Sequence, residues 1–313
     1  MVERIFERLT VIGLGLIGTS VVRAARAAGQ VGHIVVTDAD PTVRQRVREL
    51  DIADVVAETS EAAVQDADAV VLCVPVGESG RVVATVAPHL KQGAILSDVG
   101  SVKVAVIEAV LPHLPAQACF VPAHPVAGTE FSGPDAGFAE LFQDRWCILT
   151  PFERSTEAGT DAMHRLWEGF GARVERMEPR HHDMVLAITS HVPHLIAYNI
   201  VGTAAHLEEV TQTEVMKFSA GGFRDFTRIA ASDPTMWRDV FLNNKDAVLE
   251  MLGRFTEDLS ALQRMVRYGD GDGLFELFTR TRAIRKGIIA QGQETAAVDF
   301  GRRVGPEVSK KDV

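Results

Sequence analysis

The stretch Leu9–Ser20, LTVIGLGLIGTS, joins a short apolar run to three glycines and then to the start of an apolar helical pattern. Gly13, Gly15 and Gly18 form the spacing GxGxxG. Directly after a strand, the first glycine permits a tight turn, the second lets the backbone approach a pyrophosphate, and the third allows close packing of helix on strand. The helix N-terminus adds partial positive charge for phosphates. The stretch therefore predicts the opening unit of a Rossmann-type dinucleotide-binding fold.

Asp38 supports this interpretation, because it stands 20 positions after Gly18, at the end of the second predicted strand. A carboxylate there can accept hydrogen bonds from both ribose hydroxyls, and it would repel the 2′-phosphate of NADP. NAD is therefore favoured over NADP as the cofactor, although Arg44 nearby could accommodate a phosphate. The predicted cofactor-contacting positions are Gly13, Gly15, Leu16, Ile17, Gly18, Asp38 and, after the fourth strand, Pro75.

Short β-branched runs alternate with helical patterns through the first half of the chain, which is typical of a parallel sheet with crossover helices. Eight candidate strands fit one open, doubly wound, mostly parallel sheet: Leu9–Ile12, Ile34–Thr37, Val55–Val56, Ala69–Val74, Ala94–Ser97, Phe120–Pro122, Cys147–Thr150 and Arg173–Arg176. Helical patterns lie between them at Leu16–Ala28, Pro41–Leu50, Gly80–Leu90, Val102–Leu111 and Thr156–Phe170. This α/β domain is predicted to span residues 1–178.

After about Pro179 the patterns are helical, at Arg180–His206, Thr213–Phe218, Pro234–Asn243, Lys245–Tyr268 and Leu274–Gln291. We expect an all-helical second domain at residues 179–300 and a polar, mobile tail at 301–313. The segment Met184–Val201 is apolar on more than one face, which predicts packing among helices or against a second subunit. The helical domain is therefore expected to mediate a homodimer.

The composition is that of an ordinary soluble globular protein, with 46% apolar and 24% charged residues among 313, enough chain for about two domains. The 32 basic and 42 acidic residues give 32 − 42 = −10, which argues against nucleic acid or an anionic membrane as a partner. Because no hydrophobic signal core follows Met1 and no uninterrupted apolar stretch reaches about 18 residues, we expect a cytoplasmic location. Cys73, Cys119 and Cys147 lack CxxC spacing, so neither a disulfide framework nor a zinc site is indicated.

Polar residues follow successive predicted strands, among them Ser101, His124 and Glu130. In an open parallel sheet the carboxyl ends of the strands border the crevice where a nicotinamide ring and its substrate would meet. Topology therefore places Ser101 and His124 beside the reaction. On position alone, a histidine after a strand is more often structural than catalytic.

A histidine cluster stands in the helical half, where His181, His182 and Asp183 precede a helix with His191 and His194 on one face. HxxH with an aspartate could bind a divalent ion, but no thiolate or HExxH arrangement accompanies it. We predict no metal site, and capping or core histidines are the default interpretation.

The stretch Gly221–Arg228, GGFRDFTR, mixes flexible backbone with two guanidinium groups, which can bind a carboxylate bidentately. A loop held by Arg–Asp salt bridges is the alternative interpretation. Trp237, taken alone, is more often a core residue than a ligand contact.

Five motifs together resemble the prephenate and arogenate dehydrogenases of tyrosine biosynthesis: GLGLIGTS at Gly13–Ser20, SDVGSVK at Ser97–Lys103, AHPVAGTE at Ala123–Glu130, HHDMVLAITSHVPH at His181–His194 and GGFRDFTRIAASDPTMWRD at Gly221–Asp239. The resemblance spans about Leu9 to Gln291. It implies NAD-dependent oxidative decarboxylation of prephenate to 4-hydroxyphenylpyruvate, of L-arogenate to L-tyrosine, or of both. The two substrates differ only in a keto or an amino group, and the sequence does not decide between them.

The resemblance also implies the chemistry of the site. It makes His124 the general base at the hydroxyl of the substrate ring, with Ser101 assisting at that hydroxyl and near the nicotinamide. The hydride goes to the nicotinamide while His124 takes the proton, and loss of carbon dioxide makes the ring aromatic. A neutral histidine is required for this role.

The remaining substrate-binding positions follow from the same resemblance. Arg228 corresponds to an arginine that binds a substrate carboxylate, and His194 to a histidine that faces the other end of the substrate. Glu130 and Asp183 match acidic residues that gate or position the pocket. Trp237 matches an aromatic residue contributed at the dimer interface.

Two other functions stay open on the residues alone. A β-hydroxyacid dehydrogenase would use a lysine as base, but Lys217, Lys245 and Lys286 of the helical half stand in no convincing motif. A non-catalytic dinucleotide-binding protein would not need a histidine, a serine and an arginine together at the crevice. Turnover of a substrate separates these alternatives.

Overall fold

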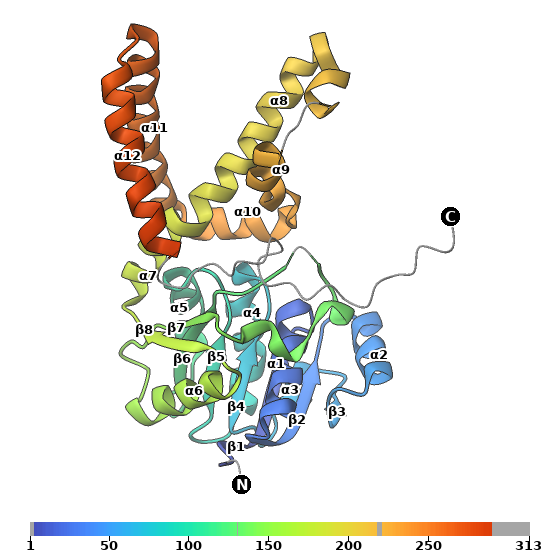
Figure 1. Ribbon diagram of the computed structural model, residues 1–313. Coiled ribbons are helices and arrows are strands. Elements are labelled where there is room, and N and C mark those ends of the chain that lie inside the picture. Colours follow the sequence, from blue (N-terminus) through green and yellow to red (C-terminus); the bar gives the residue numbers. More distant parts are fainter. Residues whose placement is uncertain (1–2, 130, 218–220, 290–313) are drawn as a thin grey trace. The chain divides into compact units, whose positions relative to one another are not determined.

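The computed structural model describes residues 3–129, 131–217 and 221–289, of which 207–217 are described by their backbone. One eight-stranded sheet has the order β3-β2-β1-β4-β5-β6-β7-β8 (Figure 1). Its strands are β1 (Phe6–Ile12), β2 (Val31–Thr37), β3 (Val55–Val56), β4 (Ala69–Leu72), β5 (Ile95–Asp98), β6 (Cys119–Pro125), β7 (Trp146–Leu149) and β8 (Arg173–Arg176). The predicted α/β fold class is confirmed.

The sheet is parallel from β3 through β6 in its spatial order. The strand β7 then pairs antiparallel with β6 and parallel with β8. The chain order changes direction between the neighbouring strands β1 and β4. In sheets of this kind, ligands bind at the carboxyl ends of the strands on either side of that change.

Helices cover both faces of the sheet. They are α1 (Leu16–Ala28), α2 (Pro41–Leu50), α3 (Ser60–Ala63), α4 (Ser79–Val86), α5 (Val104–Val110) and α6 (Glu157–Gly169). One core joins the apolar faces of α1 and α6 to sheet residues such as Leu9 and Val121. The second core joins α4 and α5 to residues such as Leu72 and Leu96 on the other face. The two cores thus hold helices against both faces of the sheet.

The second half of the described chain is helical, as predicted. It comprises α7 (Pro179–Leu186), a π-helical turn η6 (Ala187–His191), α8 (Val192–Lys217), α9 (Gly221–Thr227), a 3₁₀ turn η7 (Arg228–Ala231), α10 (Pro234–Asn243), α11 (Lys245–Tyr268) and α12 (Gly271–Ile288). Trp237 and Val240 of α10 belong to the same buried core as α4 and α5. The helix α10 therefore packs directly on the sheet domain.

Several predicted element bounds differ from those in the structure, and two of the differences change the interpretation. His124 lies inside β6 and not after it, because β6 continues past Pro122 to pair with β7, where His124 is opposite Ile148. The helical patterns at 180–206 and 213–218 are not separated, because α8 runs on to Lys217. Leu, Glu and Gln in the stretch between the two patterns are good helix formers, although apolar residues do not recur there with clear helical spacing.

The internal contacts of the chain divide it into two units, Met1–Leu252 and Gly253–Val313. The division falls within α11. The change from sheet to helices comes earlier, between the end of β8 at Arg176 and the start of α7 at Pro179. The domain boundary at residue 178 stays a prediction. The tail predicted to be mobile, residues 301–313, lies outside the described residues.

One helical run, 179–206, is long and apolar enough to cross a membrane by length and composition alone. It carries His182, Asp183 and His191 with buried side chains that hydrogen bond to other parts of the protein. Such contacts are typical of a core helix in a globular protein.

The glycine turn between β1 and α1 is constrained at two positions. Gly13 has φ +95°, and a Cβ atom there would overlap the carbonyl oxygen of Cys73 in the segment after β4. A Cβ atom at Gly18 would overlap the carbonyl oxygen of Gly13. At Gly15, by contrast, no atom of the described residues lies within 4 Å of such a Cβ. Gly18 thus serves close packing, and Gly15 leaves open space.

This difference predicts that two alanine substitutions affect stability to different extents. Gly18→Ala should lower the free energy of unfolding by about 1–3 kcal/mol, because backbone must shift to make room. Gly15→Ala should change it by less than about 0.5 kcal/mol. Urea unfolding followed by circular dichroism measures both, and a Gly18→Ala protein as stable as the Gly15→Ala protein would contradict the packing role.

Candidate functional site

The glycine turn forms a cradle for a phosphate-containing ligand. Gly15 is the N-cap of α1, and no side chain of the described residues caps the first N–H groups of that helix. Uncapped N–H groups at a helix N-terminus bind phosphates through hydrogen bonds and the helix dipole. Leu16 and Ile17, which follow, are partly buried against the core. The open space at Gly15 lets a pyrophosphate reach the backbone.

Asp38 lies beside this cradle, directly after β2. One carboxylate oxygen accepts the N–H of Leu14 at 2.7 Å, and the other accepts the N–H of Asp40 at 2.9 Å. The guanidinium of Arg44 donates to the carbonyl oxygen of Asp38 at 2.7 Å and to Glu58 at 3.1 Å. Arg44 is thus engaged by oxygens of the protein, and the carboxylate of Asp38 lies against the glycine turn. This arrangement fits NAD.

The segment after β4 connects the cradle to the helical half. Pro75 precedes the 3₁₀ turn η1 (Val76–Glu78) and is exposed. The N–H of Gly77 in that turn donates to the carboxylate of Asp239 in α10 at 2.9 Å. Val76 packs in the same core as Trp237. The loop that borders the cofactor cradle is therefore held against the helix that carries Trp237.

An ion pair is fully buried at the carboxyl ends of β5 and β6. The ammonium of Lys103, which is 0% exposed, donates to Asp98 at 2.5 Å and to the carbonyl oxygen of Ala123 at 2.6 Å. Asp98 also accepts the N–H groups of Gly100 at 2.8 Å and Ala123 at 3.3 Å. Burial lowers the pKa of Lys103, and Asp98 opposes that shift. The pair fixes the backbone directly before His124.

His124 is buried and hydrogen bonded to a second histidine. Its Nδ1 lies 2.9 Å from Nε2 of His182 in α7, and Nδ1 of His182 lies 2.8 Å from the carboxylate of Asp183. Burial lowers the pKa of His124 well below its usual value, and the neighbouring His182, Lys103 and His191 lower it further. Burial also lowers the pKa of His182, against the opposing effect of Asp183. Both imidazoles are therefore neutral at neutral pH.

Asp183 joins the helical half to the sheet domain. Its two carboxylate oxygens accept the backbone N–H groups of Lys103 and Val104, at 2.8 and 2.9 Å, where α5 begins. Its carbonyl oxygen accepts the side-chain amide of Asn244 at 2.9 Å. The side chain is 6% exposed. Among the described residues, Asp183 thus hydrogen bonds to groups of the protein itself. Its role in gating or positioning the substrate pocket stays a prediction.

A third group of side chains lies on α8 and α10. The ring of His194 stacks on Trp237, with ring centroids 3.6 Å apart, and its Nδ1 bonds the carbonyl oxygen of Ser190 at 2.8 Å. His191 is 0% exposed, and its Nδ1 accepts the side-chain amide of Asn244 at 3.0 Å. Burial lowers the pKa of His191 to about 4. Burial, with the nearby charge of Arg228, lowers the pKa of His194.

The structure places some of the predicted site residues near one another. His182 and His191 lie close enough to His124 to lower its pKa, and Arg228 lies close enough to His194 to lower its pKa. Ser101 is half-buried, two positions before Lys103. Trp237 is 7% exposed within this single chain, so its packing comes from its own subunit. Glu130 lies outside the described residues.

Four residues of this site had no assigned role in the sequence-based prediction. They are Asp98 and Lys103, which form the buried pair, and His182 and Asn244, which connect the helices. The histidine pattern had indicated His191 and His194, with Asp183, as candidate metal ligands, and it left His182 as a capping or core histidine. Among the described residues, no group of three or more His, Cys, Asp and Glu side chains is placed to hold a metal ion.

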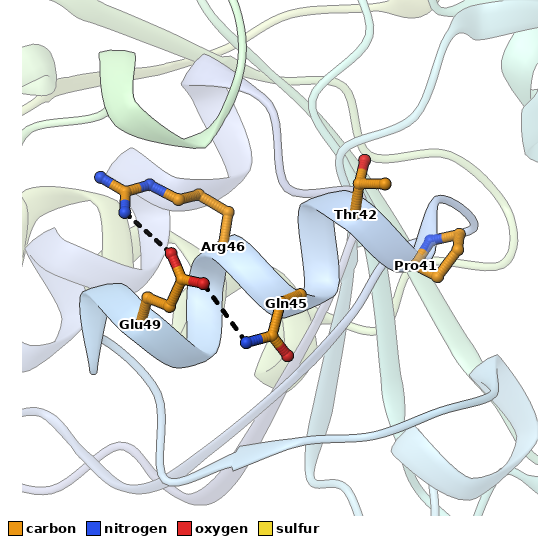
Figure 2. Close-up of a pocket in the computed structure, with 5 residues that line it drawn as sticks. All are labelled: Pro41, Thr42, Gln45, Arg46 and Glu49. Carbon is orange, nitrogen blue, oxygen red and sulfur yellow. Dashed lines mark hydrogen bonds and ion pairs between the residues drawn. The ribbon is translucent and has the colours of Figure 1, made fainter.

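A surface hollow of about 430 Å³ lies elsewhere, along α2 (Figure 2). It is lined by Pro41, Thr42, Gln45, Arg46 and Glu49, all from this one helix. Arg46 and Glu49 bind each other there at 2.9 Å. Because it contains none of the side chains described above, we assign it no function.

Comparison with known proteins identifies the family. Residues 21–176 match the family described as prephenate dehydrogenase, nucleotide-binding domain, and residues 178–280 match prephenate dehydrogenase, dimerization domain. The chain belongs to the prephenate dehydrogenase family. It is 44% identical to the cyclohexadienyl dehydrogenase of Zymomonas mobilis, over 90% of this chain and 96% of that protein.

Two further family members support the assignment. The prephenate dehydrogenase of Bacillus subtilis is 31% identical over 90% of this chain and 76% of its own length. A crystal structure of the prephenate dehydrogenase from Aquifex aeolicus, with hydroxyphenyl propionate and NAD+, has a TM-score of 0.84 and 32% identity, covering 90% and 98% of the two chains. Membership of this oxidoreductase family decides against a β-hydroxyacid dehydrogenase.

The buried pair predicts a large loss of stability when only one partner is removed. Lys103→Met should lower the free energy of unfolding by about 3–5 kcal/mol, because Asp98 then keeps a buried charge without its cation. The double variant Lys103→Met with Asp98→Asn should recover part of that loss. Chemical unfolding of the three proteins tests this, and a single variant that loses under about 1 kcal/mol would show that the pair is not needed.

Proposed function

We propose that this protein is an NAD-dependent dehydrogenase that oxidatively decarboxylates prephenate, L-arogenate or both, in the cytoplasmic synthesis of tyrosine. The observation that carries the proposal is His124, a neutral histidine held by hydrogen bonds at the carboxyl end of β6. It stands in a chain whose family relatives include a cyclohexadienyl and a prephenate dehydrogenase. A neutral imidazole there can accept a proton from a substrate hydroxyl.

The protein groups divide the work of proton transfer. His124 accepts the hydroxyl proton as the carbinol carbon is oxidised, and the proton returns to the phenolic oxygen once the ring is aromatic. Ser101 assists at the same hydroxyl. When bound, NAD supplies the acceptor for the hydride. The cradle of Gly13, Gly15 and Gly18 with Asp38, Leu16, Ile17 and Pro75 would hold it.

The carboxylates of the substrate meet the cationic side of the site. Arg228 binds one carboxylate, as a guanidinium can do with two parallel hydrogen bonds. His194 faces the other end of the substrate from its stacked position on Trp237. Glu130 completes the pocket as a gating acid. Asp183 positions the pocket through its bonds to α5.

The protein acts as a homodimer formed by its helical half. The family description of residues 178–280 as a dimerization domain supports this. Apolar side chains are exposed on α8, such as Ile200 at 37%, and on α12, such as Phe275 at 73%. Large apolar surfaces of this kind are typical of obligate interfaces.

Sedimentation equilibrium at micromolar concentration should give twice the monomer mass, and a monomer alone would refute the dimer.

Steady-state kinetics with prephenate and L-arogenate, each against NAD and NADP, tests the function directly. We expect turnover of at least one substrate and a higher kcat/KM with NAD, because the Asp38 carboxylate repels a 2′-phosphate. Asp38→Asn should lower the ratio of kcat/KM with NAD to kcat/KM with NADP. Asp51→Asn, the matched surface control, should leave that ratio unchanged. No turnover of either substrate would reject the proposed function, and a higher kcat/KM with NADP would reject the role of Asp38.

Loss of the proposed base should remove turnover and spare cofactor binding. His124→Asn keeps a polar group but cannot take the proton, so kcat should fall by about 10²–10⁴-fold. The kcat/KM of the wild type should fall on the acidic side, since protonation of His124 removes the acceptor, and the variant should lack that limb. A variant with more than about a tenth of the wild-type kcat, a deficit below about 1.4 kcal/mol, would return His124 to a structural role.

A further inference from the structure

We propose that His182 and Asp183 are positioning residues that hold His124 in one tautomer, with hydrogen on Nδ1 and the proton-accepting lone pair on Nε2. The inference rests on the proposed function only in so far as His124 is taken to be the base. It is carried by two consecutive hydrogen bonds, from His124 to His182 and from His182 to Asp183. It gives His182 a role in proton transfer, where the sequence had indicated only a capping or core histidine.

Asp183 can only accept hydrogen bonds in this arrangement. Both of its carboxylate oxygens already accept backbone N–H groups, from Lys103 and Val104. An ionised carboxylate has no hydrogen to donate. The hydrogen in the 2.8 Å bond to His182 must therefore belong to Nδ1 of that imidazole.

The orientation of the next bond follows from the neutrality of His182. A neutral imidazole carries one hydrogen, and Nδ1 already holds it, so Nε2 of His182 is an acceptor. The alternative, with hydrogen on both nitrogens, would place a cation in a site that is 0% exposed. Burial lowers the pKa of His182 and so opposes that state.

The position of the ring hydrogen on His124 follows from that of His182. Its Nδ1 must supply the hydrogen in the 2.9 Å bond to Nε2 of His182. A neutral His124 consequently has its lone pair on Nε2, the nitrogen not used in this bond. When Nε2 takes a proton, the positive charge is shared along bonds that end at the Asp183 carboxylate. A histidine oriented by a hydrogen-bonded partner and a carboxylate is a known way to hold a base in the reactive tautomer.

The local structure explains why adjacent residues can do this. His182 and Asp183 stand in the first turns of α7, which begins at Pro179 after the N-cap Glu178. Neighbouring residues on a helix point about 100° apart, so one side chain reaches β6 while the other reaches the start of α5. His181, on the same turn, is exposed.

Nuclear magnetic resonance of protein with ¹⁵N-labelled histidine rings tests the tautomer without any turnover. We expect His124 and His182 both to carry hydrogen on Nδ1 at neutral pH, with the His124 signals assigned by their absence in His124→Asn. Hydrogen on Nε2 of His124 would overturn the inference. Because this readout needs no substrate, it stands even where the proposed activity fails.

Kinetics of two substitutions at His182 then test the positioning role. Gln places an amide oxygen where it can accept the Nδ1–H of His124, so His182→Gln should keep kcat within about fivefold of wild type. Leu offers no acceptor, so His182→Leu should lower kcat by at least about tenfold, since the tautomer is no longer held. The dissociation constant for NAD and the melting temperature show whether each variant is folded.

His181→Leu is the matched control, since it makes the same change one position away on the exposed side of α7. It should leave kcat and KM unchanged. A His182→Leu protein that binds NAD normally and retains kcat within about twofold of wild type would overturn the positioning role. So would a folded His182→Gln protein as slow as His182→Leu.

Discussion

The carboxylate of Asp183 fastens α7 to α5 of the sheet domain, and the site depends on that attachment. A carboxylate on a side chain at 6% exposure is costly to bury unless its oxygens are hydrogen bonded. Here the N–H groups of Lys103 and Val104 supply those bonds at the start of α5. Satisfying the buried charge therefore fixes α7 against α5, and His182, the preceding residue, is brought to His124 as a consequence. Asn244 extends the same attachment to the junction of α10 and α11.

The parts of the fold set by short-range patterns could be predicted from the sequence. The glycine turn, the strands β3 and β8 and the helices α1, α2, α10 and α11 have the predicted bounds, because apolar spacing and terminal residues such as Pro41 and Pro234 mark them locally. The extension of β6 through His124 could not be predicted in this way. It depends on pairing with β7, which comes more than twenty residues later and runs in the opposite direction.

The site was predictable in its chemistry but not in its connections. Strand ends and motifs indicated His124, Ser101 and Arg228, because the topology of an open sheet brings such positions to one crevice. Nothing local distinguishes Lys103 from a surface lysine. Its burial depends on the strand β6, whose Ala123 carbonyl oxygen lies twenty residues further along the chain, as well as on Asp98, five residues before it. Likewise, the spacing of His191 and His194 is compatible with a metal site, and only the bond of His191 to Asn244 and the stacking of His194 on Trp237 show what each ring does.

The charges around His124 explain how an imidazole with a lowered pKa can still accept the proton of the substrate. Burial and the ammonium of Lys103 lower the pKa of His124, which keeps it neutral but reduces its affinity for protons. A hydroxyl on a carbon that is losing a hydride becomes far more acidic than an ordinary alcohol, so a weak base suffices at that moment. The imidazolium that forms is then opposed by Lys103, whose charge is largely offset by Asp98 at 2.5 Å, and favoured by the bonds that lead to Asp183. The arrangement thus disfavours a charged His124 before the reaction and supports it during the reaction, which is the condition that a general base in a dry site must meet.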